Sequence, residues 1–110
     1  MNIRKVALAV LCLVAPPAAA DPISGYVKGS GTVAIPSSLY TVVRTHRGHY
    51  TITFTNPMVP RANCVITPLR SLSVYELHES DTECRVVLHN DYSTLAVDGS
   101  FSFMAVPMSN

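Results

Sequence analysis

The sequence predicts an all-β fold, a small antiparallel β-sandwich or jelly-roll-like barrel preceded by a cleaved signal peptide. The first observation is residues 49–55, where Tyr50, Ile52 and Phe54 alternate with threonines in the pattern of a half-buried strand. The second is that further short segments of this kind follow, with turn residues between them. The third is that no long segment has apolar residues at the 3.6-residue spacing of an amphipathic helix. Short, closely spaced strands are typical of sandwiches and barrels.

The first twenty residues have the three parts of a secretory signal peptide. Arg4 and Lys5 give a positive start, residues 6–14 are apolar, and residues 18–20 are alanines. We therefore expect cleavage after Ala20 and a secreted or periplasmic product.

A membrane anchor is the main alternative reading of this segment. Its apolar stretch is shorter than the roughly 20 residues that span a bilayer, and Pro16 and Pro17 would break the helix. Cys12 follows Leu11, where lipoprotein processing needs a small residue, so we expect Cys12 to leave with the signal peptide and the mature form to have no membrane segment.

Composition limits the partners of the remaining chain. Removing residues 1–20 from the 110 leaves 90, and it removes Arg4 and Lys5 but no acid, so six basic and seven acidic residues give a net charge of −1 with histidine neutral. This balance argues against nucleic acid as a partner. Ninety residues form one domain, and charged residues at 14% with apolar residues at 48% argue against disorder.

Two cysteines remain after export, Cys64 and Cys84. Oxidising compartments convert such a pair to a disulfide, which would stabilise a small domain by about 3 kcal/mol. The alternatives are two buried free thiols, or a catalytic or metal-binding thiol pair, and the second alternative lacks a Cys-x-x-Cys spacing. In one flat meander the two cysteines would lie about 9–10 Å apart, beyond the roughly 7 Å that a bridge allows. The bridge therefore favours two facing sheets over a cysteine placed in a loop.

The expected organisation is a loose N-terminal arm over residues 21–38, in which any strand such as 32–35 is short, and a sandwich domain over residues 39–110. Strands are expected at residues 40–45, 49–55, 64–67, 72–77, 84–89 and 100–106. Alternation over residues 72–77 is faulty, which indicates a bulge or a strand covered on both sides. The side chains expected to face the core are Tyr50, Ile52, Phe54, Cys84, Val86, Leu88, Phe101 and Phe103.

The loop at residues 46–48 is the best candidate for a binding site. It has the length and the glycine of a hairpin loop, and the candidate ligand-binding residues are His46, Arg47, His49 and Tyr50. They offer hydrogen-bond donors, a ring for stacking, and imidazoles of the kind that gain charge at acidic pH. The turn at residues 90–94 is the next candidate.

The sequence favours neither a catalytic nor a metal site. His46 and His49 are too few for a closed zinc site, and the acidic cluster at residues 76–83 lacks the spacing of a calcium loop. His78 and His89 have acids nearby, but no serine lies in a Gly-x-Ser-x-Gly elbow. We expect no cofactor and no enzymatic activity.

Several short motifs between residues 43 and 106 resemble a small β domain at the C-terminal ends of phage tail-fibre proteins and in secreted bacterial proteins. The motifs are Arg44-Thr45, Gly48-His49-Tyr50-Thr51-Ile52-Thr53-Phe54, Pro57-Met58, Asn63 and Asp98-Gly99-Ser100-Phe101-Ser102-Phe103. The resemblance implies a non-enzymatic module, often a homo-trimer in fibres, that presents loops to a surface or a glycan. The chain departs from the pattern by its signal peptide, its lack of a shaft, and Cys64 in the place of an aromatic residue.

Three function classes follow from these observations. The first is a binding or adhesion module that recognises a cell-surface glycan or protein, and it predicts exposed aromatic and polar loops. The second is a structural or assembly subunit, which predicts an apolar patch and a stable oligomer. The third is a small periplasmic enzyme or inhibitor, which predicts a pocket with perturbed titratable groups.

Overall fold

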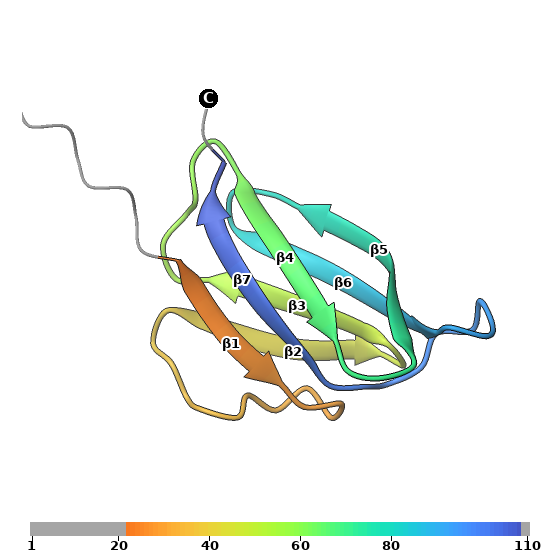
Figure 1. Cartoon of the computed structure of the whole chain (residues 1–110). Helices are drawn as coiled ribbons and strands as arrows, with labels where there is room; N and C mark the ends of the chain where they lie inside the picture. The colour runs from red at the N-terminus through yellow and green to blue at the C-terminus, as the bar shows by residue number, and fades with distance from the viewer. Residues whose placement is uncertain (1–21, 109–110) are drawn as a thin grey trace, which may run out of the picture.

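The computed structural model describes residues 22–108, which form seven strands and no helix. One antiparallel sheet has the order β1 (Ile23–Val27), β7 (Phe101–Pro107), β4 (Ala62–Pro68). The other has the order β2 (Tyr40–His46), β3 (His49–Phe54), β6 (Glu83–Asn90), β5 (Leu72–Glu79). The sheets pack face to face (Figure 1), which confirms the predicted β-sandwich.

Two predictions concern a membrane-spanning segment and the signal peptide. None of the residues 22–108 belongs to a helix long and apolar enough to cross a bilayer. The expected signal peptide, residues 1–20, lies outside the described residues.

The core lies between the two sheets and is built as the alternation predicts. All eight side chains expected to face it are buried: Tyr50, Ile52, Phe54, Cys84, Val86, Leu88, Phe101 and Phe103. Thr53, which lies between them on β3, and Thr55, which directly follows β3, are exposed. Met58, from the connection after β3, also joins the core at 5% exposure, which strand periodicity does not reveal.

The prediction of a loose arm over residues 21–38 is wrong for its first part. Residues 23–27 form β1, which pairs with β7, and Val27 is fully buried. The glycine at position 25 favours a loop in the sequence pattern. In the structure Gly25 has a packing role, because a Cβ there would collide with the ring of Tyr40. Residues 32–35 contribute only an isolated bridge, between Val33 and Val27.

The Cys64–Cys84 disulfide joins the two sheets, with 6.8 Å between the Cα atoms. Cys64 lies in β4 and Cys84 in β6, so the prediction of two facing sheets is confirmed.

A β-bulge between Val74 and Glu76 explains why the alternation of side chains in β5 is interrupted. The extra residue changes which side chains face inward, so that Leu72, Val74 and Leu77 all pack against the core. Tyr75 is left on the outside at 59% exposure.

Candidate ligand-binding site

Four connections meet at one end of the sandwich, where β1, β2, β4 and β6 end (Figure 1). They contain residues 28–31, 47–48, 69–71 and 91–100, and we call them the loop end. Backbone hydrogen bonds join the last two of them: Leu69 N donates to Ser100 O at 3.0 Å, and Asp91 N donates to Ser71 O at 2.9 Å. Side-chain hydrogen bonds connect the other two.

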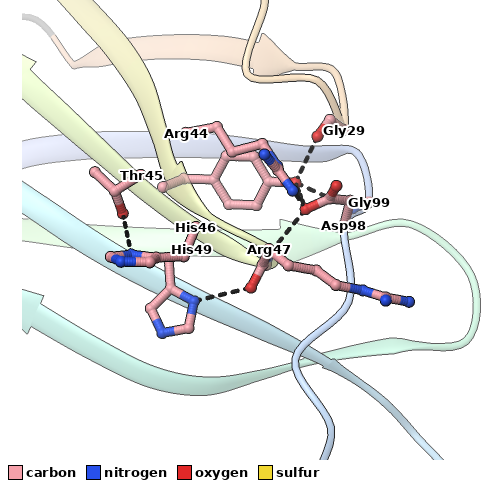
Figure 2. A network of polar contacts seen from close by, with 10 residues as sticks. Gly29, Arg44, Thr45, His46, Arg47, His49, Asp98 and Gly99 are labelled. Carbon is pink, nitrogen blue, oxygen red and sulfur yellow. Dashed lines mark hydrogen bonds and ion pairs between the residues drawn. The ribbon is translucent and has the colours of Figure 1, made fainter.

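Asp98 holds the β2–β3 hairpin against the connection between β6 and β7. Its Oδ1 accepts hydrogen bonds from Arg44 Nε at 2.8 Å and from Gly48 N at 2.7 Å, and it lies 3.4 Å from Tyr50 Oη (Figure 2). These donors stabilise the charged carboxylate, and chiefly the Arg44 hydrogen bond lowers the pKa of Asp98, against a smaller opposing effect of burial. The hairpin tip is thus fixed in place by a charge.

Tyr50 continues this network into the core. Its hydroxyl donates to Gly29 O at 2.7 Å and accepts from Gly99 N at 3.2 Å, and its ring packs edge-on against Phe101 with 5.2 Å between centroids. Burial, the largest effect, raises the pKa of Tyr50. The side chain is only 1% exposed, so the prediction that its ring is offered to a ligand is wrong. The alternation that places Tyr50 in the core decides its position.

Gly48 is required at the hairpin tip for two reasons. Its φ is +76°, in the left-handed region that favours glycine. A Cβ there would lie 2.8 Å from Val97 N and 2.9 Å from Leu88 O. The turn therefore packs its backbone directly on the neighbouring connection.

The other three predicted site residues lie at the surface of this turn. His46 and His49 are paired across the hairpin, with 5.4 Å between ring centroids. His46 Nδ1 lies 3.3 Å from Thr45 Oγ1, and His49 Nδ1 lies 2.9 Å from Arg47 O. The Arg47 side chain extends away from both imidazoles into solvent (Figure 2). The structure thus brings the two histidines together but not Arg47 with them.

The second candidate, residues 90–94, lies beside the hairpin in the 91–100 connection. Tyr92 is 88% exposed and Leu95 is 73% exposed. The turn is ordered by hydrogen bonds, because Tyr92 N donates to Asn90 Oδ1 at 2.8 Å and His89 Nδ1 lies 2.7 Å from Ser93 O. Ala96 and Val97, later in the same connection, lie against Gly48, so the connection that contains the turn is anchored at the hairpin tip.

A polar groove on the outer face of the four-stranded sheet begins at His49. The register places His49 beside Val87 and Glu76, and the next row contains Arg85 and His78. These residues line a hollow of about 260 Å³, below the roughly 300–1,000 Å³ of enclosed small-molecule pockets. Sequence reasoning missed this groove, because the bulge in β5 sets which residues lie opposite β6.

Neither metal-ligand geometry nor comparison with known proteins identifies the site. Within residues 22–108 there is no group of three or more His, Cys, Asp or Glu side chains that could hold a metal ion. The residues that carry the tail-fibre resemblance include Arg44, Gly48, Tyr50 and Asp98, whose contacts with one another give them an architectural role. Comparison of the chain with protein-family models, curated protein sequences and solved structures gives no significant match, so the resemblance stays a prediction.

Proposed function

We propose that this protein is an exported, non-enzymatic binding module that recognises a cell-surface glycan through its loop end. The observation that supports this most is the exposure of Tyr92 and Leu95 on an ordered turn. Loops on a rigid scaffold commonly carry binding residues, and a tyrosine presents a flat apolar ring with a polar hydroxyl. Such a ring suits a sugar, which has apolar faces and hydroxyl edges.

The rigidity of the loop end supports the same function. Asp98 fixes the hairpin, and the Cys64–Cys84 disulfide joins the sheets that carry the loops. A preformed surface loses little conformational entropy on binding.

The test is binding of Tyr92→Ala and Leu95→Ala variants to a glycan array and to intact bacterial cells. We expect each variant to bind at least about tenfold more weakly, with an unchanged thermal midpoint, because both side chains are exposed. Ile35→Ala is the matched control, since Ile35 is 78% exposed but lies in the connection that leads to the start of β2. Equal binding by all three variants would place the site elsewhere.

An assembly subunit is the second candidate, favoured by the outer face of the three-stranded sheet. Ser24, Tyr26, Asn63, Val65, Thr67, Ser102, Met104 and Val106 occupy this face by strand alternation, and none is charged. Val65 is 59% exposed and Met104 is 49% exposed. Light scattering of the wild type and Val65→Lys tests this function: an oligomer that the lysine dissociates would support it, and a monomeric wild type would exclude it.

A further inference from the structure

The charged side chains of this domain are segregated along the sandwich. Lys28, Arg44, Arg47 and Arg70 all belong to the loop end or to the strand end beside it. The acids Glu79, Asp81 and Glu83 lie at the end of β5, in the following turn and at the start of β6, at the opposite end, and Glu76 lies in the middle of β5. The loop end and its neighbouring strand end have four basic and two acidic residues, whereas the rest of residues 22–108 has two basic and four acidic residues, so the two parts differ in the sign of their net charge.

The loop end has cations without acidic partners. Within residues 22–108 the ion pairs are Arg44–Asp98, His78–Glu76 and Arg85–Glu83, so Lys28, Arg47 and Arg70 pair with no acid of the described chain. All three are exposed.

The two acids of the loop end are already engaged. Asp98 accepts from Arg44 and Gly48, and Asp91 accepts from the Ser73 hydroxyl. Asp98 is paired with Arg44, and Asp91 keeps its negative charge because the serine hydroxyl is neutral, so four basic and two acidic residues leave the loop end with a net positive charge. A net positive surface attracts anionic partners.

We propose that the ligand of the loop end is an anionic polysaccharide, a glycan chain with carboxylate, sulfate or phosphate groups. This inference rests on the proposed binding function and names its ligand class. Lys28, Arg47 and Arg70 come from three separate connections, an arrangement that suits charges repeated along a chain. Tyr92, in the fourth connection of the loop end, adds an exposed ring. Three cations are fewer than the 6–10 or so phosphate contacts of a typical DNA-binding protein, which favours a glycan over nucleic acid.

The experiment measures binding of the full chain, purified with its disulfide intact, to five immobilised polymers. Polygalacturonate, dextran sulfate and poly(glycerol phosphate) carry the three anions, dextran is the neutral reference, and duplex DNA is the nucleic-acid reference. The variant is Arg47→Ala/Arg70→Ala, and the control is Arg61→Ala, which removes an exposed arginine outside both the loop end and the groove beside His49. Thermal midpoints of both variants establish that they are folded.

We expect wild type to bind at least one anionic polymer about tenfold more tightly than dextran, and about tenfold more weakly at 200 mM than at 50 mM salt. The loop-end variant should lose about tenfold in affinity and the control less than twofold. The anion that binds best identifies the source of the charge. Equal losses from both variants, tighter binding to duplex DNA, or no binding to any anionic polymer would overturn the inference. If the protein instead binds a neutral glycan independently of salt, and Tyr92→Ala abolishes that binding, the proposal of an anionic ligand is wrong but the proposed binding function is supported.

Discussion

Asp98 Oδ1 and the backbone nitrogen of Gly48 lie 2.7 Å apart, although 50 residues separate them in the chain. This contact joins the tip of the β2–β3 hairpin to the connection that carries Tyr92. The carboxylate therefore contributes to the position of the hairpin tip against that connection, together with the backbone hydrogen bonds from Leu88 N to Gly48 O and from Val97 N to Leu88 O.

The first prediction concerns the pH dependence of stability at Asp98. Its pKa is lowered in the folded state, mainly by Arg44, so its contribution to stability is present above the unfolded pKa of about 3.9 and is lost as pH falls through the lower folded value. We expect Asp98→Asn to lower the free energy of unfolding by about 1 kcal/mol at pH 6, a modest figure because the site is partly exposed. Denaturant unfolding from pH 6 to pH 2 should show the two proteins converging. A constant difference across that range would contradict the account.

The second prediction concerns Gly48. Replacing it with alanine introduces a Cβ against the backbone of Val97 and Leu88 at a positive φ, and we expect a loss of about 1–3 kcal/mol in unfolding free energy. Arg47→Ala, one residue away and exposed, is the control and should change stability by less than about 0.5 kcal/mol. Thermal unfolding of the two variants checks this prediction. Similar thermal midpoints would contradict the close packing of Gly48 against Val97 and Leu88.

The third prediction tests the facing of the strands. Phe103 is 3% exposed and contacts the Tyr40 ring edge-on, with centroids 4.9 Å apart, so Phe103→Ala should cost about 3–5 kcal/mol. Thr53→Ala on the exposed face of β3 should change stability by less than about 0.5 kcal/mol. Equal losses from the two variants in urea unfolding would mean that the register is shifted by one residue.

The fourth prediction concerns the disulfide between β4 and β6. The double variant Cys64→Ala/Cys84→Ala should unfold with about 2–5 kcal/mol less free energy than the oxidised wild type. Peptide mapping without reductant should recover both cysteines in one linked fragment. Recovery of two free thiols from the native exported protein would show that the bridge does not form.

Side-chain alternation predicted most of this fold because one face of each strand is buried. Residues 49–55 and 84–89 have that alternation, and their inward side chains are those that the sequence indicates. It failed for β1, where Gly25 and Ser24 interrupt the apolar pattern, and a strand forms because β7 pairs with the segment along its whole length.

The candidate site was only partly predictable, because it depends on which connections meet. The sequence indicates the loops at residues 46–48 and 90–94, but the packing of Gly48 against Ala96 and Val97 of the following connection depends on the strand order β2-β3-β6-β5. The role of Asp98 likewise requires the β6–β7 connection to pass beside Arg44. The sequence pattern predicts Tyr50 both as a core residue and as a ligand-binding residue. Its burial and the hydrogen bonds of its hydroxyl place it in the core.

The most direct test of the proposed binding function is an amide chemical-shift titration of the isotopically labelled protein with the glycan that binds best on the array. The account predicts that the shifts concentrate at the loop end, at Arg47, Gly48 and Tyr92, and that the turn at residues 80–82 at the opposite end is unaffected. Shifts that concentrate at residues 80–82, or on the outer face of the three-stranded sheet around Val65, would contradict it.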